Sequence, residues 1–326
     1  MTRTRSIRFG AVVVASVLAL TACGGGGSAS EAGEGGLIEI TVGTMPIVTN
    51  SVLALGVEKG FFEEEGLDVT LETGQGGAAL LPAVINGQYD FAFSNNVSIL
   101  TARAQGMPVK IVAAASSAGE DPAPPDEAIV ASASSGITSL DQVRDTTVAV
   151  NQLLNMVEVA DRVALENAGV DLDSIEFIEM GFPDMPAALA NDKVDVAHVA
   201  EPFLTQAVAD GATILSAPYR EVTPDVFMSS WFTSENTIAK SPEVVEKFQA
   251  ALEKSRRYAV DHTDEVRSFI PTFIGMDADL ADKIALGNWP AGLPEETSLQ
   301  AWYDAAVTYG VFTEDQLSDP TEVLAD

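Results

Sequence analysis

The sequence predicts an α/β protein with two strand-and-helix units followed by C-terminal helices. Residues 147–202 alternate short apolar strands with amphipathic helices, and residues 38–115 show the same alternation. From Ser241 onward the apolar residues recur only at helical spacing. Alternation of this length predicts parallel sheets, with a ligand bound at the carboxyl ends of the strands.

The second unit has the clearest pattern. An apolar strand at 147–150 ends at Asn151, and a helix that precedes Gly169 follows it. The apolar face of that helix repeats every three or four residues and consists of Val157, Ala160, Val163, Ala164 and Ala168. Strands at 175–179 and 194–199 flank a short helix at 185–190, and Glu201-Pro202 ends the unit.

Elsewhere the pattern predicts strands at 38–42, 69–72, 89–93 and 109–115, with helices at 52–59, 78–86 and 97–105. Residues 116–127 read as a connector, rich in Pro, Ser and acidic residues, before a strand at 128–132 and a short helix at 140–143. After Pro202 come a helix at 203–209 and strands at 213–215 and 226–233. The last of these returns toward the first unit, so the chain crosses between the units twice. Helices at 242–252, 262–273, 277–286 and 297–308 complete the chain.

The N-terminal residues have the pattern of an export signal. Arg3, Arg5 and Arg8 precede an apolar run at 9–20, which is shorter than the roughly 20 residues of a membrane-spanning helix. Leu20-Thr21-Ala22-Cys23 resembles a bacterial lipobox, which implies cleavage after residue 22 and a lipid anchor on Cys23, with palmitate-like acyl chains in the membrane. The alternative for Cys23 is a small buried apolar side chain. Residues 23–36 then form a flexible tether of Gly, Ser and Glu.

The composition excludes several classes of protein. With 47% hydrophobic and 20% charged residues among 326, the chain is typical of an ordered globular protein of about two domains. A formal net charge of −31 argues against nucleic-acid binding, which depends on Lys and Arg at phosphates. Cys23 is the only cysteine, so no intramolecular disulfide or cysteine-based metal cluster is expected. We expect no cofactor and no metal.

Four motifs together resemble one known family. Residues 54–69, ALGVEKGFFEEEGLDV, are similar to its A-x-E-x-G-F-F-x-x-E-G-L-x-V signature. Residues 83–92, AVINGQYDFA, resemble its G-x-x-D step, and residues 187–196, AALANDKVDV, repeat that step in the second unit. Glu201-Pro202-Phe203 completes the set. Over residues 38–260 the chain therefore resembles the ABC-transporter substrate-binding lipoproteins of the nitrate/sulfonate/taurine and thiamine-precursor branch.

This resemblance implies a two-lobed type II periplasmic-binding-protein fold with C-terminal helices. The first lobe would comprise residues 37–120 and 234–326, and the second residues 121–233. Small-molecule solute would bind in the interlobe cleft and favour closure about a hinge. The loaded protein, a monomer without catalytic residues, would dock on a membrane permease with its ATPase at the extracytoplasmic face of the bacterial cell membrane.

Polar side chains at predicted strand ends are the candidate ligand-binding residues, because Asn and Ser both donate and accept hydrogen bonds. The first lobe offers Thr49, Asn50, Ser94 and Asn95. The second lobe offers Asn151, Asn155, Glu201 and Phe203. The alternatives are helix caps for Asn151, Ser94 and Asn95. For Glu201 they are a structural ion pair or a side chain that points away from the cleft.

Ligand charge stays open at this point. A cleft carboxylate from Glu201 would disfavour an anion and favour an amine or a pyrimidine-like N–H face. The nearest obvious cation, Arg103, is expected to face solvent, so an anion would depend on helix N-termini. The glycine-rich loop at 74–77 is either such an anion cradle or a tight turn, and it lacks the Lys-Ser/Thr of a nucleotide P-loop. Two classes remain: a nitrate-, sulfonate- or taurine-like anion, and a heteroaromatic such as a vitamin precursor.

Three other functions are alternatives to solute uptake. An enzyme similar to thiamine-pyrimidine synthases would need a cysteine-rich motif and a histidine, and the only base that the pattern offers is His198 beside Glu201. A ligand-sensing domain of a transcription regulator would need a helix-turn-helix arm. A scaffold lipoprotein would bind no small molecule.

Overall fold

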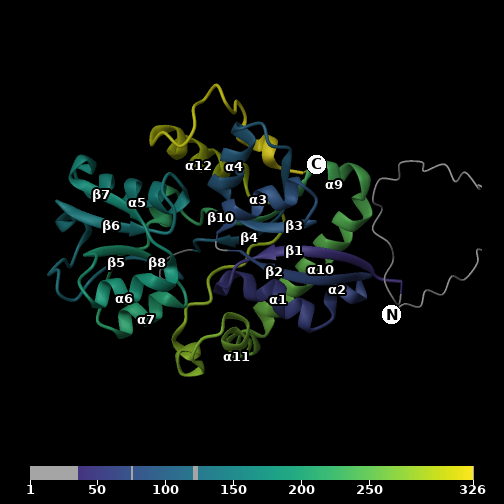
Figure 1. The fold of residues 1–326 in the computed structure, drawn as a ribbon, viewed down its shortest axis with the longest axis horizontal. Helices are drawn as coiled ribbons and strands as arrows, with labels where there is room; N and C mark the ends of the chain where they lie inside the picture. The colour runs from purple at the N-terminus through teal and green to yellow at the C-terminus, as the bar shows by residue number, and fades with distance from the viewer. Residues whose placement is uncertain (1–35, 75, 120–123, 326) are drawn as a thin grey trace, which may run out of the picture.

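The structure, a computed structural model, describes residues 36–74, 76–119 and 124–325. It has two lobes, each built around a five-stranded sheet with helices on both faces (Figure 1). The α/β class is therefore confirmed. The signal peptide, Cys23 and nearly all of the tether lie outside the described residues. Among the described residues, no helix combines the length and apolarity that crossing a membrane requires.

The first sheet has the strand order β2-β1-β3-β10-β4. Its members are β1 (Ile38–Thr44), β2 (Leu67–Thr73), β3 (Phe91–Asn95), β4 (Val109–Ser117) and β10 (Phe227–Ser234). β1 is parallel to β2 and β3, but β10 is antiparallel to β3 and β4. The expectation of a wholly parallel sheet is wrong here, because β10 enters from the second lobe in the opposite direction.

The second sheet has the order β7-β6-β8-β5-β9. Its members are β5 (Glu127–Ala131), β6 (Thr146–Val150), β7 (Ile175–Glu179), β8 (Val196–Ala200) and β9 (Thr213–Ser216). β6 is parallel to β7 and β8, as the sequence predicts, whereas β5 is antiparallel to β8 and β9. The two crossings between lobes precede β5 and β10. The predicted range of the second lobe, 121–233, included the strand at 226–233. In the structure this strand is β10, which pairs in the sheet of the first lobe.

Helices cover both faces of the first sheet (Figure 1). On one face lie α1 (Ser51–Glu58), α2 (Phe61–Glu64), α10 (Pro242–Asp261) and α11 (Thr263–Ile274). On the other lie α3 (Gly77–Ile85), α4 (Asn96–Ala104) and α12 (Glu296–Thr308), while α9 (Glu235–Lys240) follows β10. The first face is fixed by aromatic packing, with the rings of Phe91 and Phe248 stacked at 3.9 Å. The helix predicted at 277–286 is instead a 3-10 segment, Ala278–Lys283.

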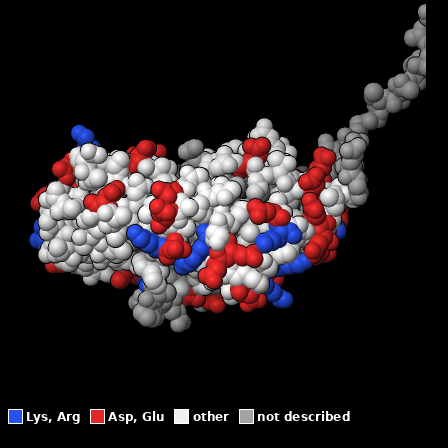
Figure 2. All heavy atoms as spheres, turned by 90° about the horizontal axis from the view of Figure 1, so that it is seen from below, with Lys and Arg blue, Asp and Glu red and all other residues white. Residues whose placement is uncertain are grey.

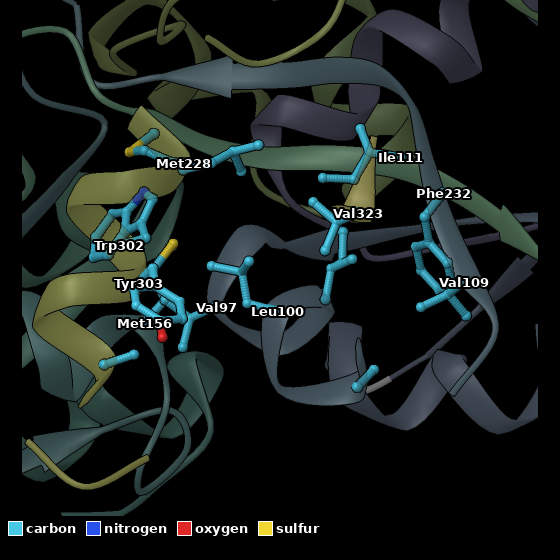
Figure 3. Packing of buried hydrophobic residues seen from close by; sticks show 14 of the residues in the cluster. Val97, Leu100, Val109, Ile111, Met156, Met228, Phe232, Trp302, Tyr303 and Val323 are labelled. Atoms are coloured by element: carbon cyan, nitrogen blue, oxygen red, sulfur yellow. The ribbon is translucent and has the colours of Figure 1, made fainter. Parts of the chain in front are cut away.

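The second lobe contains α5 (Met156–Asn167), α6 (Met185–Ala190), α7 (Phe203–Ala209) and α8 (Tyr219–Val222), with a 3-10 turn at Leu140–Gln142. The first turn of α5 packs into the core of the first lobe. Met156 and Tyr303 belong to one buried cluster with Val97 and Trp302 (Figure 3). The two lobes thus share an apolar contact on the side of the cleft where α4, α5 and α12 meet.

Candidate functional site

A narrow cavity lies between the lobes, where the sheets present their strand ends to each other. Its volume is about 40 Å³, which is room for roughly three water molecules. The polar side chains from the first lobe are Thr49, Asn95, Ser116 and Ser229. Those from the second lobe are Glu127, Asn151 and Gln152. So small a volume indicates nearly closed lobes, which must part to admit a solute larger than a few water molecules.

The four candidates from the first lobe occupy different positions. Thr49 and Asn95 line the cleft. Asn95 also caps α4, because its Oδ1 accepts from the Ser98 amide at 2.8 Å. Asn50 is fully buried and donates from Nδ2 to the Met45 carbonyl at 3.2 Å. Ser94 is fully buried behind the cleft wall and touches the start of α3, and its Oγ has no partner among the described residues.

The two asparagine candidates of the second lobe, Asn151 and Asn155, occupy different positions. Asn151 lines the cleft, and its buried Oδ1 has no hydrogen-bond partner in the described part of the chain. Asn155, not Asn151, caps α5, since its Oδ1 accepts from the Met156 amide at 2.7 Å. Its Nδ2 donates to Ser98 Oγ of α4 at 2.9 Å. Asn155 therefore connects the two lobes directly.

Glu201 and Phe203 lie away from the cleft cavity. The carboxylate of Glu201 accepts hydrogen bonds from the Thr205 amide at 3.0 Å, the Thr205 hydroxyl at 2.7 Å and the Ala285 amide at 3.1 Å. Burial raises the pKa of this carboxyl group. Phe203 packs against the core of the second lobe. In this structure the Glu201 side chain connects α7 to residue 285 and points away from the cleft. Its contacts are structural, and they are hydrogen bonds, not the ion pair that the sequence suggested.

The carboxylate that does line the cleft is Glu127, which sequence reasoning missed. It is the first residue of β5, and its side chain is 13% exposed. Its Oε2 accepts from the Tyr219 hydroxyl at 2.7 Å and lies 3.4 Å from His198 Nε2. The sequence pattern ended the acidic connector at Glu127. The feature of the sequence that could have identified Glu127 is its position, since it is an acidic residue directly before the apolar strand that enters the second lobe.

His198 lies behind Glu127 in β8 and is fully buried. Its Nδ1 is 2.6 Å from Asp161 Oδ1 of α5. Burial alone would lower the pKa of His198, but the charges and hydrogen bonds of Asp161 and Glu127 outweigh it and raise the pKa to about 9. The partners of His198 are thus Asp161 and Glu127, and the pairing with Glu201 that the sequence suggested is not found.

The charge on the described lining of the cleft is of one sign, negative. Among the described residues that line it there is one carboxylate, Glu127, and no Lys, Arg or His. Arg103 lies elsewhere in the first lobe, with Glu235 at 2.6 Å and Glu322 at 3.8 Å. Its side chain is only 17% exposed, so the expectation that it faces solvent is wrong. These ion pairs of Arg103 connect α4 to α9 and to the 3-10 segment Pro320–Val323.

A family model described as NMT1/THI5 like matches residues 50–266. The chain belongs to this family. Among curated relatives of this NMT1/THI5-like protein is a binding protein of Brucella abortus (strain 2308), 24% identical over 229 residues that cover 70% of this chain and 68% of the relative. The binding protein YtlA of Bacillus subtilis (strain 168) is 23% identical over 224 residues, 66% of this chain and 65% of YtlA.

Solved structures share the two-lobed fold of this family member. The alkanesulfonate-binding protein SsuA of Xanthomonas axonopodis pv. citri, bound to MOPS, superposes with a TM-score of 0.70 at 16% identity, covering 92% of this chain and 96% of SsuA. The periplasmic nitrate-binding protein NrtA of Synechocystis PCC 6803 gives a TM-score of 0.74 at 14% identity, covering 88% and 86%. These comparisons confirm the family resemblance and the periplasmic-binding-protein fold.

Proposed function

We propose that this protein is the extracytoplasmic solute-binding lipoprotein of an ABC importer. It captures a small organic solute in the interlobe cleft and delivers it to a membrane permease with its ATPase. The main support is the cleft itself, in which the two lobes bring polar side chains together and leave the buried Oδ1 of Asn151 unpartnered among the described residues. Buried polar atoms normally have partners, so a polar group of the solute would complete the hydrogen bonding of Asn151. The solute is either a nitrate-, sulfonate- or taurine-like anion or a heteroaromatic such as a vitamin precursor, and both classes are compatible with a polar cleft between two lobes.

Closure of the lobes is the proposed mechanism. Glu127 and Asn151 belong to one lobe, and Thr49 and Asn95 to the other. A solute that contacts both sets gains its full interactions only when the lobes are together, so it raises the population of the closed state. A permease that docks only the closed form would then distinguish loaded from empty protein.

The proposed membrane attachment is compatible with an accessible cleft. Strand β1 begins at Ile38 and runs toward the cleft, where its far end, Thr44, is buried. The described chain therefore starts at the end of the first lobe that points away from the second lobe (Figure 1). A lipid on Cys23 and the tether would hold the protein at that end. A surface with many acidic side chains (Figure 2) suits an extracytoplasmic monomer without nucleic-acid partners.

We propose binding, not catalysis, as the activity. A synthase-like enzyme would need a cysteine-rich motif and a histidine that reach its substrate. His198 is fully buried and engaged with Asp161, and no cysteine or histidine is among the described residues that line the cleft. We therefore infer that the cleft binds a solute and does not transform it.

A thermal-shift screen of the purified full-length protein tests the proposed function. The panel contains nitrate, taurine, alkanesulfonates, aromatic acids, aminopyrimidines, thiamine and organic amines. A solute that binds only the folded state raises the melting temperature, by an amount that grows with the ratio of its concentration to Kd. At least one member should do so in saturable fashion. A flat response across the panel would favour a scaffold lipoprotein.

A further inference from the structure

We propose that the cleft selects a small organic cation, an alkyl- or aryl-ammonium compound with an apolar body, whose N–H groups face Glu127. This inference rests on the proposed solute-binding function and names the ligand class of the same site. The proposed cation differs from the alkanesulfonate and nitrate anions for which SsuA and NrtA are named. Three features of the cleft bear on the class of its ligand: its charge, its apolar lining and the helices that begin there.

The cleft carries a net negative charge. Glu127 is the one ionisable side chain among the described residues that line it. Behind it, His198 and Asp161 are hydrogen-bonded at 2.6 Å, so this pair is neutral overall whichever of the two holds the shared proton. Tyr219 donates its hydroxyl hydrogen to Glu127 and remains neutral. The excess charge near the cleft is therefore that of the Glu127 carboxylate.

Basic side chains of the same region lie outside the cleft. Arg220 lines a separate cavity at the lobe connection, together with Asp126 and Asp225. The residues of the sequence that fall in the two internal gaps of the described chain, Gln75 and 120–123, include no Lys or Arg. An anion in the cleft would face Glu127 with no basic side chain of the described lining to offset the repulsion.

The apolar lining also suits an organic cation. Phe93 and Phe182 contribute aromatic rings, and Met45, Met156 and Met228 contribute thioethers. Aromatic faces attract ammonium groups through their quadrupole, and methionine side chains adapt to irregular apolar shapes. The same surfaces bury the hydrocarbon part of a ligand but offer no compensation to nitrate or a sulfonate.

Helix N-termini at the cleft provide the competing argument for an anion. Two of these helices are already capped: Asn95 accepts from the Ser98 amide in α4, and Asn155 accepts from the Met156 amide in α5. The carboxylate of Glu158, which is ion-paired with Arg162 at 2.6 Å, also accepts from the Leu154 amide at 2.6 Å and so occupies a backbone N–H at the start of α5. Among the described residues, α3, which begins at Gly77, has no side-chain cap, and neither have the short 3-10 helices that begin at Val48 and Phe182. The charge of Glu127, with no basic side chain in the described lining, therefore decides in favour of a cation.

Isothermal titration with three ligands of nearly the same shape tests this charge preference. Benzylamine is a cation near pH 7, benzyl alcohol is neutral and benzoate is an anion; nitrate and methanesulfonate are added as small anions. With the full-length wild-type protein, benzylamine should bind at least about tenfold more tightly than the other four, because a hydrogen bond between charged groups is stronger than a neutral one. This comparison needs no variant.

The variant Glu127→Gln then tests the residue. Gln keeps the size and an oxygen for the Tyr219 hydroxyl but removes the charge, so benzylamine affinity should fall by about 10- to 100-fold. The control is Glu176→Gln, the same charge change at an exposed position of β7 in the same lobe, which should leave the affinity unchanged. Melting curves confirm that each variant is folded.

Benzoate, nitrate or methanesulfonate binding as tightly as benzylamine would overturn the cation proposal, as would benzylamine affinity that survives Glu127→Gln. Either result leaves solute binding intact. If none of the five ligands binds, the cation class is rejected. If the wider thermal-shift panel is also flat, the proposed function is rejected with it.

Discussion

Asn155 of the second lobe donates its side-chain amide to Ser98 Oγ of the first lobe at 2.9 Å. Both side chains are buried, and the bond joins the first turns of α5 and α4. Around it, Met156 packs with Val97 in one apolar cluster that spans the lobes (Figure 3). This contact stabilises the nearly closed arrangement that the structure shows.

Replacement Ser98→Ala should therefore shift the protein toward an open form. It removes the hydrogen bond between the lobes but leaves the Asn155 cap on α5 in place. We expect a larger radius of gyration in small-angle X-ray scattering without ligand, and a stability loss of about 1 kcal/mol in chemical denaturation. Thr101→Ala, one turn further along α4, is the control because, within the described part of the chain, its hydroxyl bonds only to the Val97 carbonyl of its own helix. Identical scattering from both variants would contradict the role of Ser98.

Gly77 should not tolerate a side chain. A Cβ at this position would lie 2.7 Å from Ser94 Cα, a backbone atom of β3 that cannot move without disturbing the sheet. Gly77→Ala is expected to lower the free energy of unfolding by about 1–3 kcal/mol, measured by denaturant titration. Gly76→Ala is the matched control, since a Cβ there meets nothing within 4 Å and the backbone is extended. Equal effects of the two changes would refute a close approach of α3 to β3.

The buried histidine predicts a dependence of stability on pH. The pKa of His198 is raised from 6.5 to about 9 in the folded protein, so the folded state binds the proton more tightly than the unfolded state. The resulting stabilisation is fully present below about pH 6.5 and is lost as pH rises through about 9. It is at most about 3 kcal/mol, from the free energy of one pKa unit.

We expect the urea midpoint of the wild type to fall between pH 6.5 and 9.5 more steeply than that of His198→Gln. Burial together with the neighbouring Glu127 also raises the pKa of Asp126, to about 7. That group adds a decline at lower pH, between about 4 and 7, in both proteins. Parallel curves for the wild type and the variant above pH 7 would show that His198 holds no extra proton in the folded state.

Glu201→Gln should change stability more than ligand binding. Its carboxylate accepts three hydrogen bonds from Thr205 and Ala285, and Gln can accept only through one oxygen. We expect a loss of about 1–3 kcal/mol in denaturant unfolding. The affinity for any solute found in the thermal-shift screen should change less than twofold. A larger loss of affinity would return Glu201 to the binding site.

Much of the fold was predictable, because the apolar periodicity of α/β units is strong. The strand Ile175–Glu179 and the helices Met185–Ala190 and Phe203–Ala209 coincide with the predicted ranges. The direction of β5 and β10 was not predictable from periodicity, which is the same for parallel and antiparallel strands. Both strands follow a crossing between lobes, and for this reason both run against their neighbours.

The site was predicted less completely, for the same reason. Placing every ligand residue at the carboxyl end of a strand found Asn95 and Asn151 but excluded Glu127, since the amino end of an antiparallel strand faces the cleft. Glu201 does follow the carboxyl end of β8, but Thr205 and Ala285 hold its side chain away from the cavity. Side-chain direction depends on such neighbours, and those distant in the chain cannot be read from local sequence.

The most direct test of the account measures ligand binding at Asn151. The solute that stabilises the protein most in the thermal-shift screen is titrated calorimetrically into the wild type and into Asn151→Ala. Asn191→Ala, which alters an exposed amide at the end of α6, is the control. The account predicts a roughly tenfold or greater loss of affinity for Asn151→Ala alone, because the ligand would lose a buried polar partner. Unchanged affinity in Asn151→Ala would contradict binding of the solute between the lobes.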